Sequence, residues 1–386
     1  MIEKVKDRTH INWAFTILLI LVVFSNIFYF ELEKIFYLKP NLKETNFTQV
    51  HFIDVGQGDA IAIKFSNGKS MLIDSGTESY RHKLTNYLDN MIVENDTIDY
   101  VVLTHPDSDH SSNMSYIIDK YKIEKFYRPP VYETFENKKP SISSNLYKEL
   151  ILKLNDKGIN TTINNSSNVL DIGNAKITWL CPTNYMIDNY TDTNNISPVI
   201  IVEENDTKLM LTGDIDSDIE ESLINLYGEN LDIDILKLAH HGSKYSTSDD
   251  FLEYTTPKKI VVSVGENTYG HPANDTIERI LEYDEENNTN LYANFYSTKE
   301  VGNVIITLNK NMLVQNINNI DTYLFLSYFV FSSAIFVIIL IIMVKPYITY
   351  FVKKSLFDIH NILHKKRKEK EKALNSQKNI KNQKNL

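Results

Sequence analysis

Cysteine, glycine and proline are scarce in this chain of 386 residues. It contains 12 glycines, 10 prolines and a single cysteine, Cys181. The lone cysteine excludes an intramolecular disulfide and a zinc site built from several cysteines. The low glycine and proline counts exclude a collagen-like or proline-rich filament. With 42% hydrophobic and 23% charged residues, the composition is that of a folded protein with ample material for a hydrophobic core.

Acidic residues dominate the middle of the chain, whereas its C-terminal tail is basic. The overall net charge is −10, but residues 345–386 carry 12 Lys and Arg against 3 Asp and Glu, and residues 1–10 carry 3 against 2. Residues 11–344 therefore carry a net charge of −20. A region this acidic repels polyanions unless bound cations offset its field, which argues against a general nucleic-acid-binding surface there.

Two long runs contain no charged residue. Residues 11–30 (INWAFTILLILVVFSNIFYF) and 323–344 (YLFLSYFVFSSAIFVIILIIMV) are 20 and 22 residues long. At a helical rise of about 1.5 Å per residue, each is long enough to cross a bilayer core about 30 Å thick. The first run has an alternative interpretation as a cleaved signal peptide, but residues 25–33 offer no small-x-small cleavage site. We therefore expect two transmembrane helices.

Basic residues flank both expected helices on the side away from the region between them. They are Lys4, Lys6 and Arg8 before the first helix, and Lys345, Lys353, Lys354 and the run 364–368 after the second. The positive-inside rule then predicts a cell-membrane protein with residues 1–10 and 345–386 in the cytoplasm and the region between the spans outside it. The basic tail is expected to begin as a surface helix on anionic lipids, with a binding site for a specific partner as the alternative.

The region between the two runs alternates short apolar stretches with turns and helical segments. Residues 31–47 are predicted to be a linker. Several of the following stretches are apolar on both faces, which favours buried strands. Residues 48–312 are therefore predicted to form an α/β domain of two packed sheets flanked by helices. The predicted strands include residues 50–55, 60–65, 71–74, 98–104, 175–180, 198–203, 208–214, 234–239, 258–264, 290–296 and 303–308.

Several predicted strands end in residue types that bind metal ions. Any one of these residues alone is more typical of a cap or a surface position. Because the carboxyl ends of strands in a layered fold meet at one edge, side chains at several strand ends can surround one site. Imidazole and carboxylate ligands suit zinc, manganese or iron. The residues are His105, Asp107, Asp109 and His110 after residues 98–104, Asp214 at the end of 208–214, His240 and His241 after 234–239, and His271 after 258–264.

These motifs resemble a known family. HPDSDH (105–110) is similar to the H-x-[HD]-x-D-H signature of the metallo-β-lactamase superfamily, with Asp107 at the place where His is more common. The motifs DVGQGDA (54–60), LIDSG (72–76), LTGD (211–214) and HHGS (240–243) are similar, more narrowly, to the hydrolase domain of ComEC-like competence proteins. The resemblance covers roughly residues 48–309.

The resemblance implies an αββα sandwich that binds two divalent metal ions, zinc or manganese. It implies that Asp214 bridges the two ions, and that His241 binds phosphate or donates a proton. The family's usual third-motif histidine is absent, and whether His240 or His241 compensates is left open. The implied metal ligands are His105, Asp107, Asp109, His110, Asp214, His240 and His271, and the implied catalytic residues are Asp109, His241, Asn195 and Ser197.

Four further polar residues lie inside or beside the motifs. Asp54, Asp59 and Asp74 are expected to orient ligating histidines, because a carboxylate often accepts a hydrogen bond from the ring nitrogen that does not bind the metal. Lys237, three residues before His240, has two interpretations of equal weight. It is either half of a buried ion pair or a contact to phosphate.

The predicted function is that of a membrane-anchored, metal-dependent hydrolase with a phosphodiesterase or nuclease-type activity outside the cytoplasm. Its expected partners are the lipid bilayer and a phosphodiester-containing substrate, either a nucleic acid or a cell-envelope polymer. One alternative is a membrane-anchored binding or signalling module with a structural metal site. A second alternative is a surface esterase that acts on teichoic-acid or lipid head groups.

Overall fold

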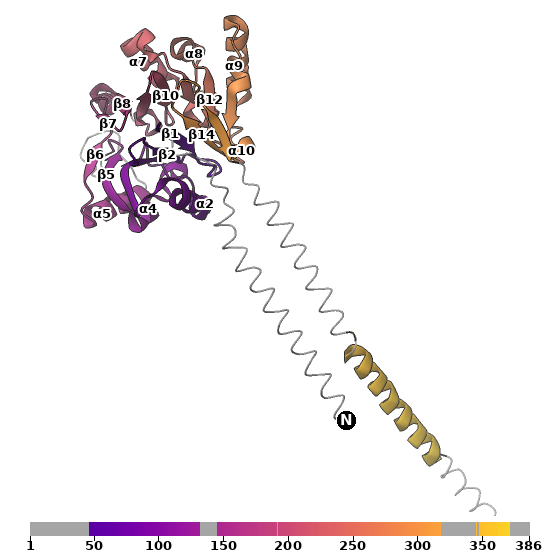
Figure 1. The fold of residues 1–386 in the computed structure, drawn as a ribbon. Coiled ribbons are helices and arrows are strands. Elements are labelled where there is room, and N and C mark those ends of the chain that lie inside the picture. The colour runs from indigo at the N-terminus through magenta and orange to yellow at the C-terminus, as the bar shows by residue number, and fades with distance from the viewer. Residues whose placement is uncertain (1–45, 132–144, 191, 318–344, 346, 371–386) are drawn as a thin grey trace, which may run out of the picture. The chain divides into compact units, whose positions relative to one another are not determined.

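The structure is a computed structural model that describes residues 46–131, 145–190, 192–317, 345 and 347–370 (Figure 1). The chain divides into two units, Glu33–Asn319 and the two terminal segments taken together. Both expected transmembrane segments, residues 11–30 and 323–344, lie outside the described residues. Among the helices of the described part, none combines the length and the apolarity that a membrane crossing requires.

Eight strands of the larger unit form the first sheet, in the order β15-β14-β1-β2-β3-β4-β5-β6. Neighbours from β15 to β3 are antiparallel, and β3 to β6 are parallel. The sheet therefore continues past residue 312, the expected end of the domain, to β15. The strands are β1 (Gln49–Phe52), β2 (Ile61–Lys64), β3 (Ser70–Ile73), β4 (Thr97–Val102), β5 (Lys122–Arg128), β6 (Thr161–Ile163), β14 (Asn303–Thr307) and β15 (Val314–Ile317).

Seven strands form the second sheet, in the order β13-β12-β11-β10-β9-β8-β7. This sheet is also mixed, because β7 to β10 are antiparallel and β10 to β13 are parallel. The strands are β7 (Val169–Ile172), β8 (Ala175–Cys181), β9 (Val199–Glu204), β10 (Thr207–Leu211), β11 (Ile235–Lys237), β12 (Lys259–Val262) and β13 (Phe295–Ser297).

Helices connect the strands, and three of those in the described part begin at side chains that cap their free N–H groups, including Thr183 at the start of α6. Asp216 accepts a hydrogen bond from the backbone of Asp218, and Ser248 accepts one from Phe251. In the other unit, residues 347–370 form one continuous helix. The helices of the larger unit are α2 (Arg81–Tyr87), α3 (Ser108–Ser111), α4 (Met114–Lys120), α5 (Asn145–Asp156), α6 (Asn184–Asn189), α7 (Ser217–Tyr227), α8 (Asp249–Thr255), α9 (Asn274–Asn287) and α10 (Thr298–Val301), with the short turns η1 (Glu78–Tyr80), η2 (Leu88–Ile92), η3 (Asn194–Ile196), η4 (Gly228–Leu231), η5 (Ala239–Gly242) and η6 (Tyr292–Asn294).

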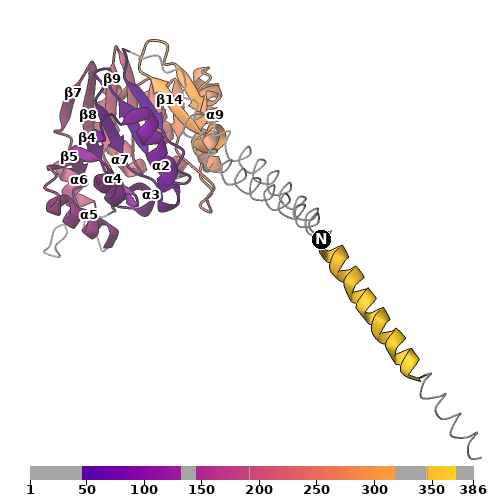
Figure 2. The ribbon, with the colours of Figure 1, turned by 60° about the horizontal axis from the view of Figure 1, so that its bottom comes forward.

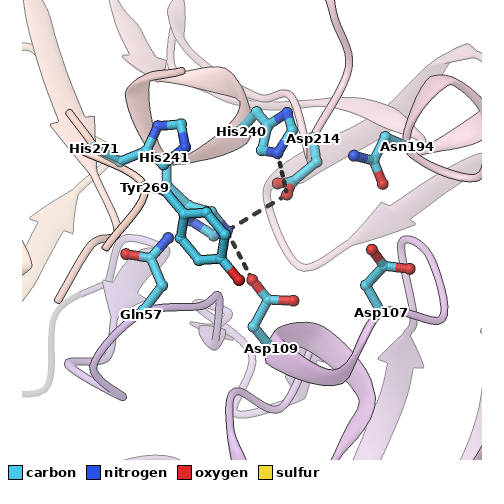
Figure 3. Close-up of a pocket in the computed structure, with 9 residues that line it drawn as sticks. All are labelled: Gln57, Asp107, Asp109, Asn194, Asp214, His240, His241, Tyr269 and His271. Atoms are coloured by element: carbon cyan, nitrogen blue, oxygen red, sulfur yellow. Dashed lines mark ion pairs between the residues drawn. The ribbon is translucent and has the colours of Figure 1, made fainter. Parts of the chain in front are cut away.

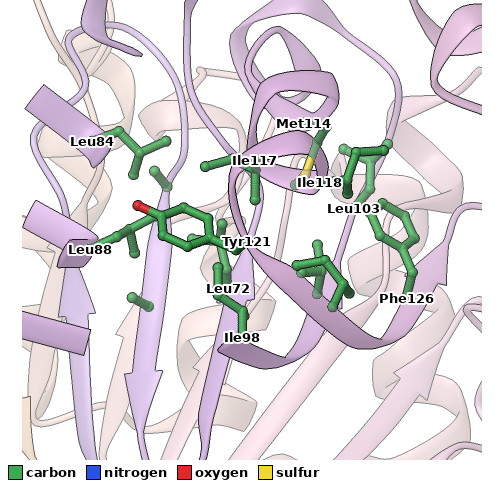
Figure 4. Close-up of a cluster of buried hydrophobic side chains, with 14 of the residues drawn as sticks. Leu72, Leu84, Leu88, Ile98, Leu103, Met114, Ile117, Ile118, Tyr121 and Phe126 are labelled. Atoms are coloured by element: carbon green, nitrogen blue, oxygen red, sulfur yellow. The ribbon is translucent and has the colours of Figure 1, made fainter. Parts of the chain in front are cut away.

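Three apolar cores show that the two sheets are sandwiched between helices, as predicted (Figure 2). Side chains of β2 alternate between two of these cores, as the two-residue period of a strand requires. Ile61 and Ile63 lie in the core between the sheets together with Trp179, whereas Ala60 and Ala62 lie in the core under α2, α4 and α5. That outer core is drawn in Figure 4. The third core joins the second sheet to α7, α8 and α9.

The parallel strands bring the predicted ligands to one edge of the sandwich. Asp74 follows β3, and His105 follows β4 in the same sheet. In the second sheet Asp214 follows β10, and His240 follows β11. The site is therefore built from loops at the carboxyl ends of parallel strands in both sheets.

Candidate metal centre

The loop after β4 supplies two buried histidines and two more exposed carboxylates. His105 and His110 are 1% and 0% exposed, and their ring centroids lie 4.0 Å apart. Between them, the turn of α3 carries Asp107 and Asp109, whose side chains are 52% and 29% exposed. The loop thus presents two buried imidazoles and two partly exposed carboxylates to the site.

Four histidines surround one oxygen of Asp214. The Oδ2 atom of this buried carboxylate lies 3.2 Å from Nε2 of His110 and 3.4 Å from Nε2 of His241. It lies 3.9 Å from Nε2 of His105 and 4.0 Å from Nε2 of His240. Figure 3 shows His240 and His241 directed at Asp214. The structure therefore places Asp214 at the centre of the predicted ligands.

Hydrogen bonds to the Nδ1 atoms of His110 and His241 fix which ring nitrogen faces Asp214. His110 Nδ1 lies 2.7 Å from Oδ2 of Asp74. This carboxylate also accepts hydrogen bonds from the backbone N–H and hydroxyl of Thr104, at 2.8 and 2.7 Å. His241 Nδ1 lies 2.8 Å from the carbonyl oxygen of Ser263, which can only accept. In both histidines the Nε2 atom is left to face the centre, as metal-ligating histidines require.

His240 and His271 form the outer side of the site. Their rings are stacked, with centroids 5.8 Å apart and planes at 20°, and His240 is 33% exposed. Tyr269 beside them is 76% exposed and tilts over the site in Figure 3. Together they line a pocket of about 190 Å³, whose other walls are Gln57, Asp107, Asp109, Asn194, Asp214 and His241.

The carboxylates and imidazoles shift each other's pKa values. Burial raises the pKa of Asp214, but His110 and His241 outweigh burial and hold it well below its usual range. Burial lowers the pKa of His110, but Asp214 and Asp74 outweigh it and hold that pKa well above its usual range. Burial dominates at His105, whose pKa lies well below the usual value. An ionised Asp214 therefore faces a protonated His110 and a neutral His105, and His110 must lose its proton before it can bind a metal cation.

Unpaired buried atoms at the centre fit a metal ion. Within the described part of the chain, His110 Nε2, His241 Nε2 and Asp214 Oδ1 are buried and have no hydrogen-bond partner, which is costly unless another group satisfies them. Four groups of three residues in the described part have all their potential ligand atoms within 4.8 Å of one another, and two of these groups contain only predicted metal ligands and His241. Nitrogen and carboxylate oxygen donors of this kind suit zinc and manganese. These two groups are His105, His110 and Asp214, and Asp109, His110 and His241.

Lys237 forms a buried ion pair, the first of its two predicted interpretations. Its Nζ atom lies 2.6 Å from Oδ2 of Asp59, and both side chains are almost fully buried. The other oxygen of Asp59 lies 3.8 Å from Nδ1 of His241. Asp59 is therefore next to this histidine but too far away to form the expected hydrogen bond to its ring. Asp54 does not orient a histidine, because its carboxylate pairs with Lys83 at 2.5 Å.

Asn195 and Ser197, the implied catalytic residues of the segment 194–197, do not line the pocket. The amide of Asn195 donates to Asp216 at 2.7 Å and accepts from the backbone of Asp216, so it shapes a turn. The neighbouring Asn194 lines the pocket instead. The hydroxyl of Ser197 lies 3.3 Å from Nδ1 of His105, which places it behind that ring.

Besides Asn194, four residues of the site were not assigned from sequence. Thr104 supports Asp74, and Gln57 and Tyr269 line the pocket. Gln57 lies inside a quoted motif, Thr104 directly precedes another, and Tyr269 lies two residues before His271, so these positions could have been found from the sequence. Ser263 acts through its backbone carbonyl, which no side-chain pattern reveals.

Comparison with known proteins agrees with this geometry. The sequence pattern of the Metallo-beta-lactamase superfamily matches residues 53–266. The chain is 26% identical over 242 residues to ComE operon protein 3 of Bacillus subtilis (strain 168), covering 58% of this chain and 29% of that protein. It is 28% identical over 245 residues to Recombination protein 2 of Haemophilus influenzae (strain ATCC 51907 / DSM 11121 / KW20 / Rd), covering 61% and 26%. The chain thus spans less than a third of the length of either relative.

The chain is also similar in fold to solved structures. The metallo-beta-lactamase fold protein YhfI from Bacillus subtilis covers 68% of this chain and 99% of its own, with a TM-score of 0.43 and 11% identity. The superfamily pattern extends over more than half of the chain and includes His105, His110 and Asp214. The chain therefore belongs to the metallo-beta-lactamase superfamily and is a distant homologue of the ComEC-like competence proteins.

Proposed function

We propose that this protein is a membrane-anchored hydrolase that uses two divalent metal ions to cleave phosphodiesters outside the cytoplasm. The observation that carries the hydrolase proposal is the convergence of four imidazole Nε2 atoms on Oδ2 of Asp214, all within 4.0 Å. One relative is named for recombination, a process of nucleic acids. That name supports a phosphodiester substrate over a lactam or a thioester.

The charge of the site supports two ions. Lys237 provides one positive charge at the inner end of the site. Five carboxylates surround the histidines, and uncompensated charge near the protein interior is strongly unfavourable. With the histidines neutral, as metal binding requires, the carboxylates and Lys237 leave four negative charges, which two divalent cations would match. The carboxylates are Asp59, Asp74, Asp107, Asp109 and Asp214.

Burial distinguishes the two adjacent histidines. His241 is 2% exposed, and its Nε2 atom lies 3.3 Å from Asp109 and 3.4 Å from Asp214. His240 is 33% exposed and lies 4.0 Å from Asp214. We therefore assign His241 as a metal ligand. His240, with His271 stacked on it, is assigned to hold the phosphate or to donate the leaving-group proton. This assignment exchanges the roles that the resemblance implied for His240 and His241, a choice that the sequence left open.

Divalent ions bound here would lower the pKa of a coordinated water and polarise a phosphoryl oxygen. The chain's own residues orient the reacting groups. Asp74 and Ser263 hold His110 and His241 with their Nε2 atoms toward the centre. The pocket of about 190 Å³ is small beside the roughly 300–1,000 Å³ of drug-sized ligand sites. It therefore admits the reacting group, while the ester substituents extend past Tyr269.

The test is a substrate panel on the purified full-length chain loaded with Mn²⁺ or Zn²⁺. Hydrolysis of bis-nitrophenyl phosphate is expected to exceed that of the nitrophenyl monoester. His241→Ala should lose bound metal and activity together. His240→Ala should keep its metal and lose about 10²-fold or more in rate, the usual size of a general acid–base contribution. His82→Ala, at an exposed histidine of α2, is the matched control and should change neither property.

Three results would contradict the proposal in different ways. A thermal unfolding curve that chelator leaves unchanged would exclude a metal site, because a bound ion stabilises the native state by mass action. Bound metal without hydrolysis of any diester, thioester or lactam would favour the binding or signalling module with a structural metal. Hydrolysis of choline or lipid head-group esters alone would favour the surface esterase.

A further inference from the structure

The helix over residues 347–370, here called the tail helix, contributes none of the metal-centre residues described above. It is yellow in Figure 1 and lies in the terminal unit of the chain. Every residue from 347 to 370 is exposed. A long exposed helix with a purely polar surface would need no partner, so the distribution of its apolar residues decides whether it has a binding face.

The tail helix carries an apolar stripe along one face. Its members recur at spacings of three, four and seven residues, which place them on one side of a helix of 3.6 residues per turn. Each is more than half exposed. Tyr350 and Phe357 lie off this stripe, near the opposite side. The stripe consists of Ile348 (57%), Phe351 (65%), Val352 (52%), Leu356 (61%), Ile359 (52%), Ile362 (56%) and Leu363 (62%).

Basic residues flank the stripe and follow it. The tail helix has seven Lys and Arg against Asp358 and Glu369, a net charge of +5. Lys353 and Lys354 stand on the polar side near its start. Five of the last six residues, 365–370, are Lys or Arg. A second copy of so basic a helix would be repelled, whereas an anionic surface would be attracted.

We infer that the tail helix binds anionic lipid, lying in the plane of the membrane surface with the apolar stripe among the acyl chains and the basic residues at the head groups. An apolar face joined to a Lys-rich polar face is the pattern of interfacial helices. Anionic lipids attract Lys and Arg near the surface. The uncharged run 323–344 ends three residues before the tail helix, so the sequence places the helix beside the expected membrane span. The inference does not depend on hydrolase activity.

The test compares two labelled positions on opposite faces. Ile359→Cys lies on the apolar stripe, and Asn361→Cys, two residues on, lies about 200° around the helix at 100° per residue. Each is made in the full-length chain with Cys181→Ala, labelled with an environment-sensitive fluorophore, and reconstituted in vesicles. The vesicles contain phosphatidylcholine alone or phosphatidylcholine with phosphatidylglycerol, with a lipid-borne quencher in each.

In the anionic vesicles, the label at position 359 is expected to shift to the blue and to be quenched by lipid, while the label at 361 remains in water. Adding Lys365→Gln and Lys366→Gln should lower the ratio of inserted to free helix by about fivefold for each lysine. Equal quenching of both labels, or none at 359, overturns the inference. Shielding at 359 that grows with the protein-to-lipid ratio in both lipids means that a second copy covers the stripe, and also overturns it.

Discussion

Lys237 holds together the loops of the metal centre although it lines no part of the pocket. Its Nζ atom pairs with Asp59 and also donates to the carbonyl oxygens of Gly213 and Leu238, each at 3.3 Å. Gly213 directly precedes Asp214, the central carboxylate. Burial lowers the pKa of Lys237, but Asp59 and Asp214 outweigh it and raise that pKa above its usual value. The ammonium therefore stays charged.

Replacing this lysine is predicted to destabilise the fold. Lys237→Met leaves the carboxylate of Asp59 buried without its partner, which typically costs about 3–5 kcal/mol. Urea unfolding in the presence of chelator measures the loss apart from metal binding. Lys122→Met is the control, because Lys122 pairs with Glu124 on the surface and little change is expected. Equal stability of Lys237→Met and the parent would show that the buried pair contributes nothing.

His51 is predicted to make stability depend on pH between about 3 and 6.5. Burial and, secondarily, the charge of Lys64 lower the pKa of His51 to about 3 from 6.5. Between these values the unfolded chain binds a proton that the folded protein does not, so stability falls as pH is lowered. The slope is at most about 1.4 kcal/mol per pH unit. His51→Asn should remove this part of the slope in urea unfolding at pH 4 to 6.5, and an unchanged slope would contradict it.

At the scale of elements, the β1–β2 loop fits against the loop that carries Asp109. Gly58 has a φ of +141°, and a Cβ there would lie 2.3 Å from the carbonyl oxygen of Asp109. The next residue, Asp59, donates its backbone N–H to that same oxygen at 3.2 Å. The position of the Asp109 loop therefore depends on the absence of a side chain at residue 58.

Gly58→Ala is predicted to weaken metal binding by displacing the Asp109 loop. Gly158→Ala is the matched control, because Gly158 also has a positive φ but a Cβ there would have no atom of the described residues within 4 Å. The control should lose only the roughly 1–2 kcal/mol of a left-handed non-glycine residue. Manganese titration calorimetry compares the two variants. Similar metal affinity in both would mean that the Gly58 contact does not position the site.

At the scale of the whole molecule, we predict that both termini are cytoplasmic and the metal centre is outside. The reason is the basic residues that flank both uncharged runs on the side away from the domain. Protease added to intact cells should digest the region 48–312 and spare a tag at either end. A digested C-terminal tag with a protected domain would reverse the predicted orientation.

The sequence by itself determined the features that depend on local patterns. Short apolar runs predicted most strands of both sheets, although not β5, β6, β7 or β15, and metal-binding residue types at their carboxyl ends predicted the gathering around Asp214. The residues 105–110 lie within one loop, so their spacing alone indicated that they face one site. These predictions succeeded because neighbouring residues decide strand formation and because the ends of parallel strands meet at one edge.

Only the tertiary structure decided where each polar side chain of the site points and which group it contacts. His240 and His241 are adjacent and both have positive φ, at 48° and 56°, so no helical or strand period predicts where either ring points. The direction of His241 is set by the carbonyl of Ser263 on the next strand connection. The partner of Lys237 is Asp59, from the other sheet's first hairpin. Such contacts join residues far apart in the chain, and only the packing of the two sheets brings them within hydrogen-bond distance.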